Sequence, residues 1–173
     1  RVRVVGTVTY YETGGTWQVS GLSYREFKPN DPSNTIMISE GNSAANKETS
    51  AEVFATGTMD VETLNALDSE ETTVKTFEYA NLAMSTSISM KNLKVKSAYT
   101  TRNGGDSDGA MTLTCDANGT SIDVRTIVLY DDNGRLLTEA DFLNKTIDVT
   151  GIVDYFSGAY QIKVFSAKDI TVR

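Results

Sequence analysis

The sequence predicts an all-β protein, and three observations indicate this class. Apolar and polar residues alternate over many short segments of the 173-residue chain, as they do in strands with one buried face. The composition of 23 Thr and 15 Ser, with many Val and Tyr and only 2 Pro, favours strands over helices. Gly, Asn and Asp residues separate these segments as turns. We therefore expect short strands joined by tight turns, with few helices.

In the first half of the chain, a hairpin is the clearest expected feature. Its turn is Gly14-Gly15, which separates two alternating segments. A short helix is expected later, because Asp60 is a good capping residue and Val61 and Leu64 are spaced as on one helix face. In chain order, the expected elements are strands over residues 1–11, 16–20, 35–38 and 53–56 and a helix over residues 60–67.

In the rest of the chain, alternation and turn chemistry predict a longer series of elements. Asn118-Gly119 is a strong hairpin signal between two alternating segments. Thr138, with Asp141 three residues later, is a typical helix start. In chain order, the expected elements are strands over 74–79, 93–102, 110–115 and 121–128, a helix over 138–143, and strands over 146–156, 160–165 and 169–172.

The two ends of the chain resemble each other in sequence. Aligning Gly6 with Gly151 matches residues 2–19 to residues 147–162, with two extra residues in the first turn. Each copy has a strand with a central glycine, an aromatic pair, a tight turn and a return strand that begins aromatic-Gln-aliphatic. Because a glycine weakens a strand unless the strand bends sharply, as at a barrel corner, these copies indicate small barrels.

The second half of the chain resembles the OB-fold, a five-stranded Greek-key barrel with a short helix between its third and fourth strands. The order of elements expected over residues 93–165 fits this fold. Residues 147–155, together with residues 160–162 and 167–170, look like the closing strands of OB-like domains in exported bacterial proteins, lipoproteins among them. The resemblance implies a fold and is nearly uninformative about the ligand, because this fold hosts unrelated functions.

The repeat and this resemblance together imply two OB-like five-stranded Greek-key barrels in tandem, with short helices. Residues 1–80 would form the first barrel, which is irregular or incomplete, and residues 81–173 the second. The alternative is one larger β-barrel or sandwich with a long central insertion.

The absence of histidine excludes many catalytic mechanisms. It removes His-based acid/base catalysis, Ser-His-Asp and Cys-His nucleophile pairs, and a common nitrogen ligand of metals. The sequence also has no Gly-rich dinucleotide motif and no phosphate-binding loop of the Walker type. We therefore predict that the protein is not an enzyme and that it has no metal site and no cofactor.

The net charge of −7 disfavours general binding of polyanions, because such binding needs Lys and Arg to release counterions from phosphates. The acidity lies in residues 1–86, so any polyanion site is expected in the second half. The single cysteine, Cys115, alternates with Met111 and Leu113 and is expected to be a buried thiol. No apolar run approaches the ~20 residues of a membrane span.

A first candidate binding surface lies in the first half. It combines aromatic rings with cations, as suits a sugar ring, a base or a partner protein, and its members are Arg3, Tyr11, Trp17, Tyr24 and Arg25. Tyr11 is expected to be exposed, because it alternates onto a polar face with Thr7 and Thr9. The alternative is that Tyr10, Trp17 and Phe27 pack in a core.

A second candidate surface is basic. Strand alternation places Lys94, Lys96 and Arg102 on one face, with Arg125 on a neighbouring strand. Such a face on an OB-like barrel would bind single-stranded nucleic acid. The alternative is a solvated outer face, where lysines also prevent edge pairing. Residues 110–129 contain no aromatic residue, so the usual stacking platform is missing.

These observations predict a non-enzymatic binding or interaction module of an exported bacterial protein, located in the periplasm or at the cell surface. A carbohydrate or a protein is the expected partner. The alternative is OB-type binding of single-stranded nucleic acid, and a third interpretation is a structural spacer without a ligand.

Overall fold

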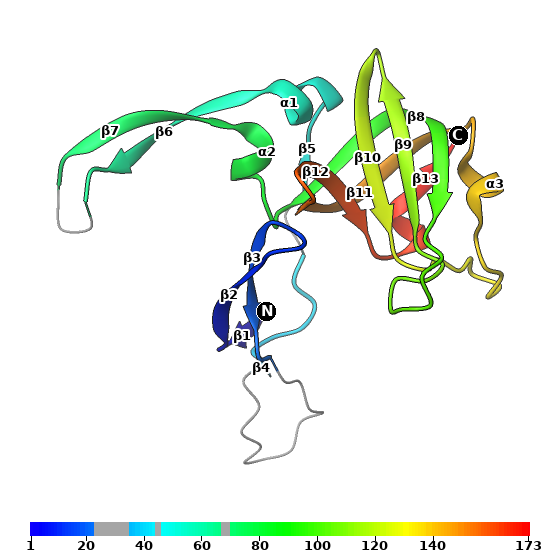
Figure 1. Ribbon diagram of the computed structural model, residues 1–173, viewed down its shortest axis with the longest axis horizontal. Helices are drawn as coiled ribbons and strands as arrows, with labels where there is room; N and C mark the ends of the chain where they lie inside the picture. Colours follow the sequence, from blue (N-terminus) through cyan, green and yellow to red (C-terminus); the bar gives the residue numbers. More distant parts are fainter. Residues whose placement is uncertain (23–34, 44–45, 67–69) are drawn as a thin grey trace. The chain divides into compact units, whose positions relative to one another are not determined.

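The computed structural model describes residues 1–22, 35–43, 46–66 and 70–173 (Figure 1). The chain is mostly β-structure with short helices, as the sequence predicts. It divides into two compact units: Arg1–Ala45 with Tyr155–Ala159, and Asn46–Asp154 with Tyr160–Arg173. No helix in the described part of the chain has the length and apolar character needed to cross a membrane.

The second unit contains a closed five-stranded barrel. Its strands are β8 (Ser87–Thr100), β9 (Met111–Ala117), β10 (Thr120–Thr126), β11 (Thr146–Phe156) and β12 (Ala159–Val164). They are ordered β11-β12-β10-β9-β8, and pairing of β8 with β11 closes the barrel. Strands β10 and β12 run parallel, whereas β8 is antiparallel to both β9 and β11. Together with α3 (Glu139–Phe142) between β10 and β11, this arrangement is consistent with an OB-like fold.

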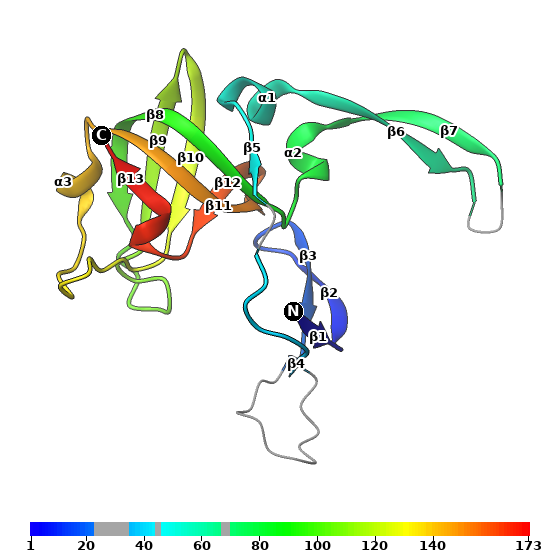
Figure 2. The same cartoon turned by 180° about the vertical axis from the view of Figure 1, so that it is seen from behind.

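Three short elements extend the barrel. Strand β13 (Ile170–Val172), which follows the 3-10 helix η1 (Ala167–Asp169), pairs with β11 (Figure 2). Strand β5 (Lys47–Glu48) pairs parallel with β8. The seven-stranded sheet that results has β13 at one end and β5 at the other.

Alternating aliphatic side chains fill the barrel, and the alternation that predicted the strands therefore also identifies the core. The largest fully buried side chains are Ile88, Met90, Leu93, Val95, Met111, Leu113, Val124, Leu129, Ile147, Val153, Ile162 and Val164. Cys115 is buried among them, as predicted. Burial, and secondarily the charge of Asp123, raises the pKa of its thiol to about 12, so the thiol is protonated and unreactive at neutral pH.

The turns of the barrel also follow the sequence signals. Asn118 and Gly119 join β9 to β10 with φ angles of 53° and 88°, the left-handed conformation that an Asn-Gly hairpin turn requires. At the start of α3, Asp141 accepts a hydrogen bond of 2.7 Å from the backbone N–H of Thr138, as the predicted capping pair would. Arg135 binds the same carboxylate at 3.0 Å and reaches Asp131 at 3.1 Å.

The Asp141 carboxylate makes barrel stability depend on pH. Hydrogen bonds from Arg135, and then from the backbone of Thr138, lower its pKa from 3.8 to about 2. A lowered folded-state pKa stabilises the fold above pH 3.8, and this contribution disappears as the pH falls through about 2. We expect Asp141→Asn to lower the free energy of unfolding by about 1 kcal/mol at pH 7 and by almost nothing at pH 2, in urea titrations at both pH values. As a control, Asp132→Asn, at a highly exposed carboxylate, should have no measurable effect. An equal loss at both pH values for Asp141→Asn would contradict the stabilising role of the ionised Asp141 carboxylate.

The elements over residues 51–78 differ from the sequence prediction. The expected strand at 53–56 is a helix, α1 (Ala51–Thr56), and the expected helix at 60–67 is a strand, β6 (Thr58–Leu64). Ser50 caps α1 by accepting a hydrogen bond from the Val53 N–H at 3.2 Å. Strand β6 pairs antiparallel with β7 (Thr72–Glu78), and the short helix α2 (Tyr79–Leu82) follows. Pairing over the full length of β6 outweighs the local spacing of Val61 and Leu64 that favoured a helix.

The first unit consists of two-stranded sheets. Strand β2 (Thr7–Tyr11) forms the predicted hairpin with β3 (Thr16–Ser20), and β1 (Val2–Val4) pairs antiparallel with β4 (Thr35–Met37). The described residues of this unit contain no closed barrel, and the tandem arrangement stays a prediction, as does the division into residues 1–80 and 81–173.

Candidate ligand-binding cleft

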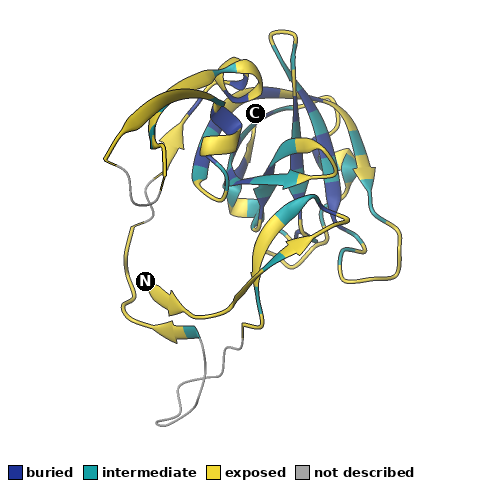
Figure 3. Ribbon diagram, turned by 60° about the vertical axis from the view of Figure 1, so that its left-hand side comes forward, coloured by how far each residue is buried: buried dark blue, intermediate teal, exposed yellow. Residues whose placement is uncertain are grey.

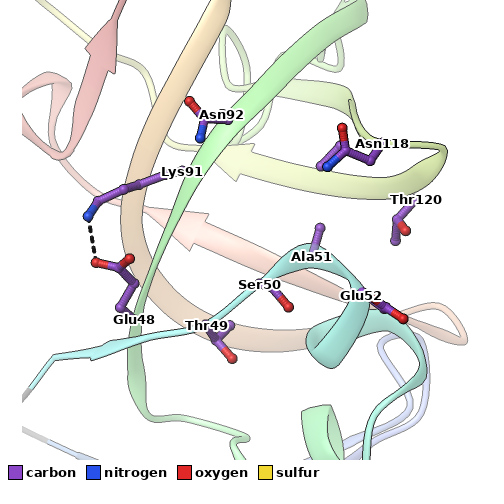
Figure 4. Close-up of a pocket in the computed structure, with 10 residues that line it drawn as sticks. Glu48, Thr49, Ser50, Ala51, Glu52, Lys91, Asn92, Asn118 and Thr120 are labelled. Carbon is purple, nitrogen blue, oxygen red and sulfur yellow. Dashed lines mark hydrogen bonds and ion pairs between the residues drawn. The ribbon is translucent and has the colours of Figure 1, made fainter.

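A polar cleft of about 700 Å³ lies in the second unit (Figure 4). Three segments line it: residues 48–52 at the end of β5 and start of α1, residues 91–92 in β8, and residues 117–120 at the turn between β9 and β10. Sequence reasoning missed this cleft, because its segments come together only through the long-range pairing of β5 with β8 and through the fold of the barrel.

The first wall is held by backbone pairing and by a helix cap. Glu48 is paired with Ser89 of β8, and the Thr49 N–H donates to the Ser89 carbonyl at 2.9 Å. Ser50 then starts α1. The chain therefore leaves the sheet and enters the helix along one edge of the cleft, which places Glu52 on the lining.

The second wall is formed by β8, at the point where its pairing with β11 is irregular. The register between β8 and β11 shifts between Ile147 and Val149, and Lys91 and Asn92 face this shift. Asn92 has a φ of 60° and donates its backbone N–H to the Asp148 carboxylate at 2.9 Å. This bond is among the causes that lower the pKa of Asp148, so the carboxylate stays ionised and holds the irregular backbone in place.

The third wall is the hairpin turn between β9 and β10. The Gly119 N–H donates to the Asp116 carboxylate at 2.9 Å, which fixes the turn. Asn118 and Thr120 lie on the lining. Within the described part of the chain, the side chains of Asn92, Asn118 and Thr120 form no hydrogen bond, so their amide and hydroxyl groups remain available to a ligand.

The charges of the lining are nearly balanced. Lys91 and Glu48 form an ion pair at 2.6 Å, and Glu52 adds one negative charge. The remaining side chains that line the cleft are amides, hydroxyls and alanine methyl groups. Such a surface offers donors and acceptors to a neutral polar ligand and no excess positive charge to an anion.

The predicted basic face is not continuous. A bulge between Val95 and Ser97 reverses the alternation in β8, so Ala98 packs against the core and Tyr99 points outward. Arg102 lies beyond the end of β8. The prediction that Lys94, Lys96 and Arg102 share one strand face is therefore wrong, because simple alternation cannot show a bulge.

Acidic side chains interrupt the same surface. Asp116 is the register partner of Lys94 and lies 3.8 Å from the Lys96 ammonium group. Asp123 is half-buried on β10, two residues from Arg125 on the same face. The positive charges are thus partly offset where the sequence suggested that they would add together.

Arg125 belongs instead to a row of side chains across four strands. Register pairs place Tyr99 beside Thr112, Thr112 beside Arg125, and Arg125 beside Lys163. The Arg125 guanidinium donates to the Thr112 hydroxyl at 3.0 Å, and the Lys163 ammonium group lies 5.8 Å from the centre of the Phe165 ring. Sequence reasoning missed Tyr99, Lys163 and Phe165, because register between strands decides which residues meet.

The first-half candidates have mixed outcomes. Tyr11 is exposed, as expected, and Arg3 is also exposed. Trp17 and Tyr10 are exposed too, with ring centroids 5.3 Å apart, so the interpretation that they pack in a core is wrong. Tyr24, Arg25 and Phe27 lie outside the described residues. Ligand binding by these side chains stays a prediction.

No group of three or more metal-ligating thiol or carboxylate side chains lies together in the residues that the structure describes. Comparisons with known proteins give no match: no family model fits the sequence, no curated protein is similar in sequence, and no solved structure is similar.

Proposed function

We propose that the protein is a non-enzymatic binding module whose ligand is a neutral carbohydrate held in the cleft of the second unit. The observation that carries this proposal is a set of lining amide and hydroxyl groups that form no hydrogen bond among the described residues, those of Asn92, Asn118 and Thr120, beside the Lys91–Glu48 ion pair. Sugar hydroxyls donate and accept hydrogen bonds, as these side chains do. The resemblance to OB-like domains of exported bacterial proteins supports a location in the periplasm or at the cell surface.

The expected affinity is modest. The cleft is open and lined by exposed polar groups, so each hydrogen bond to the ligand contributes about 1 kcal/mol net. Four or five such bonds correspond to a dissociation constant of about 1 mM, which is equivalent to about 4 kcal/mol. Repeated copies on a polymeric glycan would raise the effective affinity without new contacts.

We expect Asn118→Gly and Asn92→Gly to weaken carbohydrate binding about 3- to 10-fold each, because each removes one amide from the cleft. Glycine keeps the left-handed backbone that both positions adopt. Titration calorimetry or NMR shift titration with a panel of neutral oligosaccharides measures the effect. Asn144→Gly is the matched control, since Asn144 is exposed, has a left-handed φ of 64° like the two cleft positions and does not line the cleft. The proposal fails if no oligosaccharide shows saturable binding at about 10 mM, or if both cleft variants bind like the parent protein.

A second candidate function is binding of single-stranded nucleic acid on the outer face of the barrel. The row of Tyr99, Arg125 and Lys163 favours it, because it combines an exposed ring with two cations. Lys94, Lys96 and Arg102 would act only as peripheral charges. Titration of labelled single strands at low and high salt separates the two functions, since phosphate contacts give a steep salt dependence and neutral sugars give none.

A further inference from the structure

The first unit repeats the closing strands of the barrel, and the repeat includes strand pairing as well as sequence. Under the alignment of Gly6 with Gly151, Val2–Val4 of β1 correspond to Ile147–Val149 of β11. Both segments pair antiparallel with a short strand in the same register: β1 with residues 35–37 of β4, and β11 with Ile170–Val172 of β13. Strands β1 and β2 together thus correspond to β11, β3 corresponds to β12, and β4 corresponds to β13.

The two aligned glycines have the same packing environment. A methyl group at Gly6 would lie 2.7 Å from the carbonyl oxygen of Ser20 and 2.6 Å from the Val19 side chain. A methyl group at Gly151 would lie 2.6 Å from the carbonyl oxygen of Lys163 and 2.7 Å from the Ile162 side chain. Because the contacts fall on aligned residues, the two hairpins share one geometry.

Burial differs sharply between the copies (Figure 3). We define the hairpin face as Val8, Tyr10, Trp17 and Val19; register places Val8 opposite Val19 and Tyr10 opposite Trp17. Val8 is 64% exposed and Val19 48% exposed, whereas their counterparts Val153 and Ile162 are 1% and 0% exposed. The hairpin face therefore has the composition of a barrel core without the cover of one.

The second unit shows what covers such a face. Strand β8 runs antiparallel along β11 and β10 runs parallel along β12, and both direct aliphatic side chains into the barrel. Among the described residues of the first unit, no strand occupies the corresponding edges of β1, β2 or β3. An open strand edge beside an apolar face is the arrangement that binds an added β-strand.

We propose that the hairpin face is a docking surface for a partner polypeptide that adds a β-strand antiparallel to β1 and β2. The partner strand presents aliphatic side chains at alternate positions, as β8 presents Ile88 and Met90 to the second unit. This surface is separate from the carbohydrate cleft, so the failure of one proposal leaves the other standing.

A peptide with the sequence of residues 87–97, the part of β8 that carries its buried side chains, is the probe. Trp17 is the only tryptophan and is 71% exposed, so its fluorescence reports on the hairpin face of the full chain. We expect saturable binding, with a shift of Trp17 emission to shorter wavelength and at least a twofold drop in acrylamide quenching. A peptide with Ser in place of Ile88, Met90, Leu93 and Val95 should cause neither change.

Matched variants of the full chain locate the binding surface. Val8→Thr should weaken peptide binding about tenfold, because it places a hydroxyl against the added strand. Val5→Thr should leave binding unchanged, because Val5 is equally exposed but outside the hairpin face. Three results would overturn the proposal: no emission change at 1 mM peptide, a Trp17 already shielded from acrylamide in the monomeric chain, or shielding that grows with protein concentration and marks a second copy as the occupant.

Discussion

Val153→Ala is expected to lower the free energy of unfolding of the barrel by about 2–3 kcal/mol, whereas Val8→Ala should lower it by less than about 0.5 kcal/mol. The substitution is the same and the positions are equivalent in the repeat, but Val153 is 1% exposed and Val8 is 64% exposed. Truncation at Val153 removes buried methyl groups and leaves a cavity, while truncation at Val8 removes surface already in contact with water.

Urea denaturation followed by circular dichroism measures both values. Circular dichroism reports on the strands of the barrel, whereas tryptophan fluorescence does not, because these strands contain no tryptophan. Ile162→Ala and Val19→Ala form a second equivalent pair with the same contrast in burial. Equal losses within either pair would show that the hairpin face is covered in the isolated chain, and would contradict the assignment of that face as an open surface.

The barrel was predictable from the sequence because its signals are local and agree with one another. Burial alternates along residues 146–154, and the strand has the bounds that were predicted. The Asn118-Gly119 turn and the Thr138 and Asp141 pair act over two or three residues, so their geometry needs no distant partner. Where short-range rules and burial point to the same element, reading the sequence is sufficient.

The failures have the opposite cause. Over residues 51–64, helix and strand signals are short and conflicting, and pairing with β7 decides between them. The bulge at Lys96 leaves no mark on composition, yet it exchanges the faces of Ala98 and Tyr99. The cleft depends on β5 lying beside β8, about 40 residues away along the chain, a distance over which alternation carries no information.

Gly151→Ala is expected to lower the free energy of unfolding of the barrel by about 3 kcal/mol. Its backbone is extended and accepts any residue, so the cost is steric: the new methyl group would lie 2.6 Å from the carbonyl oxygen of Lys163. A backbone oxygen cannot move aside as a flexible side chain can, and β11 and β12 would have to separate inside a closed barrel. Thermal or urea unfolding followed by circular dichroism measures the loss.

Two glycine controls separate this steric effect from a general cost of replacing glycine. Gly105→Ala should cost less than about 0.5 kcal/mol, because its nearest neighbour would be a side-chain oxygen of Asn103 at 3.6 Å. Gly6→Ala meets contacts as short as those at Gly151, but its hairpin is one of the two separate two-stranded sheets of the first unit and can open to relieve them. It should therefore leave barrel unfolding unchanged while weakening the β2–β3 hairpin, seen as a change in Trp17 fluorescence. If Gly151→Ala proves as mild as Gly105→Ala, the absence of a side chain at Gly151 is not what allows β11 and β12 to pack closely, and the repeated glycine loses its structural explanation.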